Sequence, residues 1–159
     1  MKIAYKHLTN HIKSTISVDE ISSKLFQLGH EHEINDEIFD LELTPNRGDC
    51  LSLNGILRDL NVFYDIDLSN ELFLDDISLF EFDFDNKIQD ICPKISFMKI
   101  DIEDTVKDYN GELKSFFKEL GNNKNNFFTD ISNYISYETG QPTHCYDYQK
   151  INGKLILEQ

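Results

Sequence analysis

The spacing of apolar residues predicts a helix near the start of the chain. Within residues 17–29, apolar side chains recur at intervals of four and three residues, as expected for one buried helix face. The residues of this face are Ile21, Leu25 and Leu28. Ser17, with Glu20 three positions later, has the sequence of a capping box, and Gly29 favours a left-handed ending.

An alternation of apolar and polar residues predicts two strands after this helix. Residues 30–34 and 38–43 are short strand patterns, and residues 35–37 between them suit a hairpin. The apolar face of the second strand consists of Phe39, Leu41 and Leu43.

A second helical pattern begins near Asp49, which we predict to be its N-cap. Its apolar stripe consists of Leu53, Ile56, Leu57, Leu60, Phe63 and Tyr64. Gly55 lies inside the pattern, where glycine costs about 1 kcal/mol relative to alanine. We therefore expect a close packing contact at Gly55.

The second half of the chain mixes strand and helix patterns. We predict strands over residues 80–85 and 95–102 because apolar residues recur there at strand spacing. Residues 111–120 have helical spacing and end at Gly121.

Two further elements are expected near the end of the chain. A helix capped by Thr129 or Asp130 ends at Gly140. Asn152-Gly153 is a strong hairpin signal, which predicts that residues 148–151 turn back into residues 155–157.

These elements predict an α+β chain in two parts. Residues 1–66 form a small helix-strand-strand-helix unit, residues 67–78 are the expected linker, and residues 79–159 form an incomplete mixed sheet with two helices. Because the last strand pattern, residues 155–157, ends the chain with an open edge, we expect an N-terminal piece of a longer protein or a partner that covers the edge.

The composition argues against several classes of protein. The 159 residues carry a net charge of −14, and residues 65–104 contain twelve acidic residues against three lysines. Binding to phosphates requires a basic surface, so this chain alone is expected to bind nucleic acid poorly. No apolar run approaches the ~20 residues of a membrane span, and the start of the chain lacks a secretory signal. Three scattered cysteines do not suggest a disulfide framework, which favours the cytoplasm.

Histidine and cysteine do not predict a metal site. His30 and His32 could share one metal, but two ligands make no structural zinc site, so we predict no metal. His7 and His11 are interpreted as surface residues. Cys50 and Cys145 lack a local base and are interpreted as buried thiols.

The segment Leu43-Thr44-Pro45-Asn46-Arg47-Gly48-Asp49-Cys50-Leu51-Ser52, followed by Gly55-Ile56-Leu57-Arg58-Asp59, predicts a tightly shaped turn between strand and helix. Asp49 and Asp59 offer partners for Arg47 and Arg58. We interpret this segment as a structural turn that arginine–carboxylate hydrogen bonds lock.

The segment from Asp130 to Asp147 offers polar groups that could converge on a small ligand. Ser132 and Asn133 lie on the predicted helix, and a Gly140-Gln141-Pro142 turn leads back toward His144. Tyr134 and Tyr137 would lie beside such a ligand. The alternative is a capped helix end with a hydrogen-bonded core histidine.

Together the two segments resemble the β subunit of bacterial phenylalanyl-tRNA synthetase. The first matches a Thr-Pro-Asn-Arg-x-Asp-Cys-Leu turn followed by Gly-x-x-Arg-Asp. The second matches Asp-x-Thr-Asn-Tyr followed by Glu-x-Gly-Gln-Pro-x-His-x-Phe/Tyr-Asp, with Ser132 in place of the threonine. Weaker similarity extends over essentially the whole chain.

The resemblance implies a ligase that attaches phenylalanine to its tRNA with ATP and Mg²⁺, as an α2β2 heterotetramer. In this family the α subunit carries the aminoacylation site, and a separate site in the β subunit hydrolyses mischarged Tyr-tRNA. By position, the resemblance implies that Ser132, Asn133 and His144 belong to this editing pocket, and that residues 79–159 begin the editing (B3/B4-type) domain. It implies structural roles for the motif residues Asn46, Arg47, Asp49, Arg58, Gln141 and Pro142.

The sequence also departs from the family. Ile34 runs almost directly into Ile38, so the tRNA-binding domain that most bacterial β subunits insert at this point is absent. We therefore expect tRNA to be bound through the complex, and we expect this chain to bind neither ATP nor Mg²⁺ and to have no catalytic residues when alone. The alternatives are a non-enzymatic protein-interaction relic and a free-standing trans-editing hydrolase.

Overall fold

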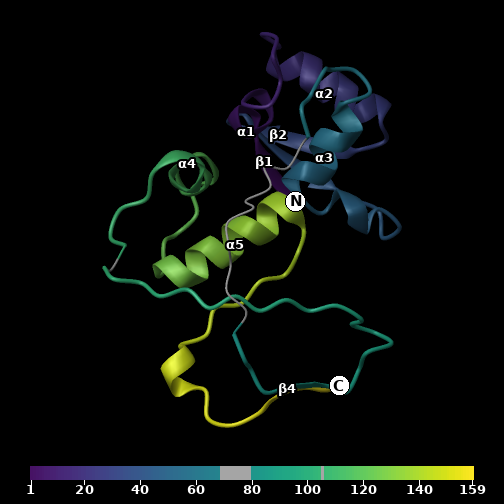
Figure 1. The fold of residues 1–159 in the computed structure, drawn as a ribbon. Helices are drawn as coiled ribbons and strands as arrows, with labels where there is room; N and C mark the ends of the chain where they lie inside the picture. Colours follow the sequence, from purple (N-terminus) through teal and green to yellow (C-terminus); the bar gives the residue numbers. More distant parts are fainter. Residues whose placement is uncertain (69–79, 105) are drawn as a thin grey trace. The chain divides into compact units, whose positions relative to one another are not determined.

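The computed structural model describes residues 1–68, 80–104 and 106–159 and confirms the α+β class (Figure 1). The strands are β1 (Lys2–Ala4), β2 (Glu31–Asn35), β3 (Ile38–Glu42), β4 (Phe84–Asn86) and β5 (Leu155–Leu157). The α-helices are α1 (Tyr5–Thr9), α2 (Val18–Gln27), α3 (Leu53–Leu60), α4 (Gly111–Leu120) and α5 (Phe127–Thr139). Two 3₁₀ turns are η1 (Gly48–Cys50) and η2 (Tyr148–Lys150).

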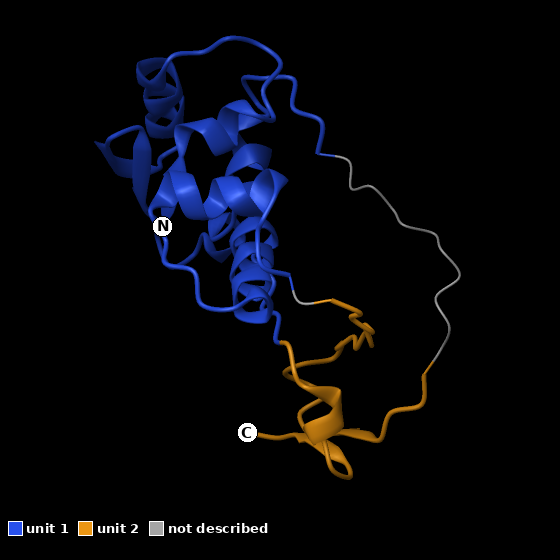
Figure 2. Cartoon of the chain, turned by 90° about the vertical axis from the view of Figure 1, so that its left-hand side faces the viewer, with its two compact units in different colours: residues 1–70, 106–144 blue, residues 71–105, 145–159 orange. Residues whose placement is uncertain are grey.

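The chain folds into two compact units, each of which is made of two separate stretches of sequence (Figure 2). Unit 1 contains residues 1–70 and 106–144, and unit 2 contains residues 71–105 and 145–159. Helices α4 and α5, which were expected in the second part of the chain, therefore pack within unit 1. The expected linker, residues 67–78, lies outside the described residues except for its first two positions.

The sheet of unit 1 has the order β1-β3-β2, and both pairs are antiparallel. This confirms the predicted hairpin of β2 and β3, in which Ile34 pairs with Phe39. Asp36 and Glu37 turn the hairpin with positive φ values of 49° and 65°, as a two-residue loop of matching twist requires. Phe39 and Leu41 are buried, so the predicted apolar face of β3 is the face that packs on the core.

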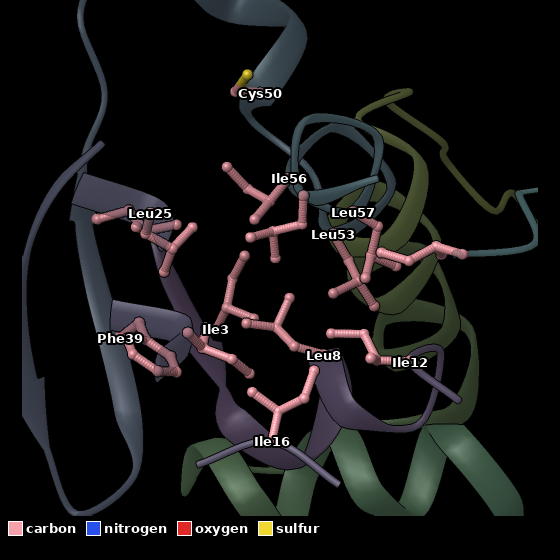
Figure 3. Packing of buried hydrophobic residues seen from close by; sticks show 14 residues of the cluster. Ile3, Leu8, Ile12, Ile16, Leu25, Phe39, Cys50, Leu53, Ile56 and Leu57 are labelled. Carbon is pink, nitrogen blue, oxygen red and sulfur yellow. The ribbon is translucent and has the colours of Figure 1, made fainter. Parts of the chain in front are cut away.

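The core of unit 1 collects side chains from the sheet and from helices α1, α2 and α3 (Figure 3). Its buried members include Ile3, Leu8, Ile21, Leu25, Phe39, Cys50, Ile56, Leu57 and Leu60. Helix α2 begins as predicted, because the Ser17 side chain accepts a hydrogen bond from the Glu20 amide at 3.2 Å.

Helix α3 differs from the prediction at both ends. Its N-cap is Ser52, whose Oγ accepts from the Gly55 amide at 2.9 Å, and not Asp49, which lies in η1 and binds arginines instead. The helix ends at Leu60, so Phe63 and Tyr64 lie beyond it. The close contact at Gly55 is confirmed: an added Cβ would lie 2.2 Å from the backbone oxygen of Asp49.

Helices α4 and α5 pack through aromatic side chains. Phe116 contacts Tyr134 and Tyr137, with ring centroids 5.7 and 4.9 Å apart. Gly121 and Gly140 end the two helices in the left-handed conformation, as predicted. The predicted N-cap of α5 is wrong, because Asn126 caps the helix and accepts from the Thr129 amide at 3.1 Å.

Unit 2 contains less regular structure than the sequence predicts. Strands β4 and β5 pair in parallel, with Phe84 opposite Leu155. Of the strand predicted over residues 80–85, only the end is in β4, and residues 95–102 form no strand at all. Alternation alone does not make a strand, because the backbone groups also need a hydrogen-bonded neighbour.

The predicted hairpin at Asn152-Gly153 is also wrong. Residues 148–150 form η2, which begins where the Asp147 carboxylate accepts from the Gln149 amide. Gly153 does turn the chain, with a φ of +77°, but β5 then pairs with β4 rather than with the residues before the turn.

Candidate functional site

A buried carboxylate fixes the start of α5, the helix that carries Ser132 and Asn133. Asp130 is fully buried and accepts hydrogen bonds from the Tyr109 hydroxyl at 2.6 Å and from the Asn125 amide at 3.1 Å. These bonds join the first turn of α5 to the loop before it and to Tyr109, which precedes α4. Asp130 therefore sets the position of the helix from inside the fold, although the sequence suggested a cap.

The loop after Gly140 folds back along α5. Ser136 donates through Oγ to the backbone oxygen of Gln141 at 3.1 Å, and Thr143 donates through Oγ1 to the backbone oxygen of Ser132 at 3.2 Å. Gly140, with a φ of +75°, makes the turn that lets the loop fold back. It also packs closely on Ser52. These two hydrogen bonds hold the loop after Gly140 against α5.

The three predicted pocket residues differ in exposure. Ser132 is half-buried, whereas Asn133 and His144 are exposed. The alternative of a core histidine at position 144 is therefore wrong. Cys145 is also exposed, because it follows the loop that leaves α5, so its interpretation as a buried thiol is wrong.

The tyrosines of α5 form internal hydrogen bonds. The Tyr134 hydroxyl lies 2.7 Å from a Glu112 oxygen and 2.9 Å from a Glu138 oxygen. The Tyr137 hydroxyl lies 2.8 Å from Nδ1 of His7. Burial raises the pKa of both tyrosines, and the carboxylates raise that of Tyr134 further. Both hydroxyls therefore remain protonated at neutral pH and stabilise the fold.

His7 is buried, so its interpretation as a surface residue is wrong. Burial lowers the pKa of its imidazole and favours the neutral form. Its Nε2 and the Ser115 hydroxyl have no hydrogen-bond partner among the described residues. Both line a hollow of about 20 Å³ between α1, α4 and α5, which has room for one water molecule.

The turn before α3 is locked by arginine–carboxylate bonds, as predicted. Arg47 binds Asp49 through two nitrogens, at 3.1 and 3.2 Å, and Asp59 at 2.5 Å, while Arg58 also binds Asp49. Hydrogen bonding to Arg47 lowers the pKa of Asp49 to about 2. Burial opposes ionisation of Asp59, but hydrogen bonds from Arg47 and His30 outweigh it and lower its pKa. Asn46 is exposed beside this network.

Cys50 lies inside the same network and confirms the interpretation of a buried thiol. Burial raises its pKa to about 11, so the thiol is neutral. Donor atoms of His30, Cys50 and Asp59 lie within 4.8 Å of one another. The sequence did not predict this cluster because 29 residues separate His30 from Asp59. His32 points elsewhere and contacts the Ser22 hydroxyl at 2.8 Å.

Unit 2 has its own open hollow of about 1170 Å³. Phe97 packs there on Phe82 and Phe84, with ring centroids 5.0 and 4.8 Å apart. Charged and amide side chains such as Lys94, Lys99 and Gln89 complete its lining. None of the predicted pocket residues lines this hollow.

Comparisons with known proteins converge on one family. The sequence model described as the B3/4 domain matches residues 91–159. The chain is 34% identical over 131 residues to the phenylalanine–tRNA ligase β subunit of Thermotoga maritima, an alignment that covers 80% of the chain and 16% of that protein. It is 36% identical over 128 residues to the β subunit of Rickettsia felis, with 78% and 15% covered.

A third relative matches nearly the whole chain. The phenylalanine–tRNA ligase β subunit of Rhodopirellula baltica is 28% identical over 172 residues, which covers 99% of the chain and 24% of that protein. The chain thus spans less than a quarter of the length of these relatives. No solved structure matches. Among the described residues, no helix has the length and apolar character needed to cross a membrane.

Proposed function

We propose, because the chain belongs to the family of phenylalanine–tRNA ligase β subunits, that it supports the ATP-dependent attachment of phenylalanine to its tRNA and contributes part of an editing site. The editing site would hydrolyse tyrosine that has been attached to this tRNA in error. The observation that best supports it is the return of residues 141–144 onto α5 through the Thr143–Ser132 hydrogen bond, within the segment that the B3/4 model matches.

A separate editing site is needed because one pocket cannot discriminate well between phenylalanine and tyrosine. A pocket built for phenylalanine rejects a substrate with one added hydroxyl only weakly, by a factor of about 10². A second pocket that hydrogen-bonds the tyrosine hydroxyl discriminates better, because phenylalanine would leave its polar groups unpaired. Such a pocket needs polar side chains that can reach the substrate.

Ser132, Asn133 and His144 are our candidates for these groups. The Ser132 side chain would keep the hydroxyl of the family's threonine and lose its methyl group, so hydrogen bonding could persist with poorer packing. Asn133, which is exposed, would bind a backbone or substrate amide. The exposed imidazole of His144 would line the pocket near the ester and help to place water.

The partners of the chain are proposed on the same basis. The α subunit would supply the aminoacylation site, where ATP and Mg²⁺ act, and tRNA would be bound by the cytoplasmic complex. Two features support this division of roles. The charge of −14 disfavours tRNA capture by this chain, and exposed apolar side chains favour a protein contact. These side chains are Ile91, Ile95, Phe97, Met98, Ile100 and Ile102.

Co-purification with the α subunit of the same organism tests the subunit role. We expect the tagged chain to retain the α subunit through gel filtration as one complex. A matched variant, Met98→Asp with Ile100→Asp, adds charge to the exposed apolar segment and should weaken retention without unfolding unit 1. Free elution of both proteins at micromolar concentration would contradict the proposal.

A further inference from the structure

Arg47 places one nitrogen among three potential metal ligands. Its Nη2 lies 2.5 Å from Oδ2 of Asp59, 2.7 Å from Sγ of Cys50 and 3.2 Å from Oδ2 of Asp49. His30 reaches the same Asp59 oxygen through Nε2 at 3.0 Å. A positively charged nitrogen therefore stands where a bound cation would contact a thiol and two carboxylates.

The side chains around this nitrogen have the chemistry of a transition-metal site. Imidazole nitrogen, thiolate sulfur and carboxylate oxygen are the three ligand types that zinc uses in proteins. The donor atoms of His30, Cys50 and Asp59 all lie within 4.8 Å of one another, and a set of three protein ligands with one open position is common for zinc.

We propose that His30, Cys50 and Asp59 form a latent site for a zinc-like divalent cation, which the Arg47 guanidinium closes. Arg47 acts as a tethered cation that neutralises the cluster. The site opens only when this guanidinium is removed. Nothing in the proposed editing function requires the site, so the two proposals fail independently.

The positions of the residues explain why the cluster would survive the loss of Arg47. His30 and Cys50 are buried, and Asp59 is held on α3, so packing keeps the three side chains near one another, and their donor atoms need only a small approach to share one ion. The Arg47 side chain, by contrast, is 32% exposed and can be shortened without emptying the core. A metal that binds there takes the thiolate, and the thiol proton leaves to the buffer.

The positive charges of two arginines explain why the wild-type chain would not bind the metal. The guanidinium of Arg47 occupies the position that a divalent cation would take. The guanidinium of Arg58, which binds Asp49, lies close by. Like charges at such short distances repel each other. Arg58 alone should not close the site, because its Nη2 lies 3.8 Å from Cys50 Sγ, farther than that of Arg47.

Titration of the full chain with Co²⁺ tests the proposal, because cobalt replaces zinc and its thiolate complexes absorb light. We expect Arg47→Ala to gain a saturable one-to-one thiolate-to-cobalt band that the wild type lacks. Arg58→Ala, the matched control, should resemble the wild type. Arg47→Ala with Cys50→Ser should lose the band.

A second variant guards against misfolding. If circular dichroism shows that Arg47→Ala is unfolded, Arg47→Gln removes the charge while keeping much of the side chain, and the band is expected there. Absence of the band in every folded Arg47 variant would overturn the proposal. Equal cobalt binding by the wild type, or a band that persists without the Cys50 thiol, would overturn it as well.

Discussion

Single buried polar residues hold α5 within unit 1, and sequence patterns do not identify them. His7 contacts Tyr137 across 130 residues, and Asp130 holds Tyr109 from inside the fold. The residue types suggested a surface histidine and a helix cap. Only the tertiary contacts show that both side chains are buried, because Tyr137 lies 130 residues from His7 and Tyr109 lies 21 residues from Asp130.

Burial of His7 predicts that acid destabilises the fold. Its folded pKa is lowered below 6.5, so the unfolded chain takes up a proton at higher pH than the folded chain. The free energy of unfolding should therefore fall as pH drops below 6.5 toward the folded pKa. Urea unfolding at about pH 7.5 and about pH 5.5 measures this loss.

Two variants identify the cause of that dependence. His7→Asn keeps a hydrogen-bonding group near Tyr137 but cannot take up the proton, so the loss between the two pH values should shrink. Tyr137→Phe removes the hydrogen bond and leaves His7 buried, so the loss should persist. An unchanged loss in His7→Asn would assign the acid sensitivity to another group.

Asp130→Ala, a substitution at a buried position, should destabilise unit 1. The change leaves the Tyr109 hydroxyl and the Asn125 amide without their acceptor, which costs about 1–3 kcal/mol. Tyr109→Phe should cost less, because Asp130 keeps its bond to the Asn125 amide. Chemical denaturation of each variant measures the difference, and an equal or smaller loss in Asp130→Ala would contradict this role.

The local sequence predicts the helices and the hairpin of unit 1, but it predicts only some of the residues that cap the helices. Ser17, Gly121 and Gly140 end or begin helices as the sequence predicts, because each acts on its own backbone. Asp49 was the wrong cap for α3 because Arg47 and Arg58 engage its carboxylate. In unit 2 the strand pattern of residues 155–157 is confirmed as β5, whereas that of residues 95–102 is wrong, since a strand depends on a neighbour that the pattern does not supply.

Gly55→Ala tests the packing of α3 against η1. Alanine favours helices by about 1 kcal/mol, but its Cβ would lie 2.2 Å from the Asp49 backbone oxygen. Overpacking of this kind costs about 1–3 kcal/mol, so we expect a net loss of stability by chemical denaturation. Gly48→Ala, where an added Cβ meets nothing within 4 Å, should change stability by less than about 0.5 kcal/mol. A stabilised Gly55→Ala would contradict the packing.

At the scale of the molecule, the sequence predicts the class and the family better than the arrangement. The α+β class and the turn–helix motif around Arg47 and Arg58 are confirmed. The division into units differs from the predicted boundaries because α4 and α5 return to the N-terminal residues through contacts such as His7–Tyr137. For the editing pocket, the residue types follow from the sequence, the return of the loop to Ser132 is seen only in the structure, and the pocket itself remains a prediction.

Hydrolysis of mischarged Tyr-tRNA shows whether the chain contributes to an editing site. The chain alone should neither hydrolyse it nor attach phenylalanine to tRNA. In a full ligase complex that also supplies the rest of the editing domain, the chain should support hydrolysis that His144→Ala reduces and the exposed control Asn122→Ala does not, with phenylalanine attachment unchanged in both. Hydrolysis by the isolated chain, or a complex that edits equally well with His144→Ala, would contradict the proposed editing role.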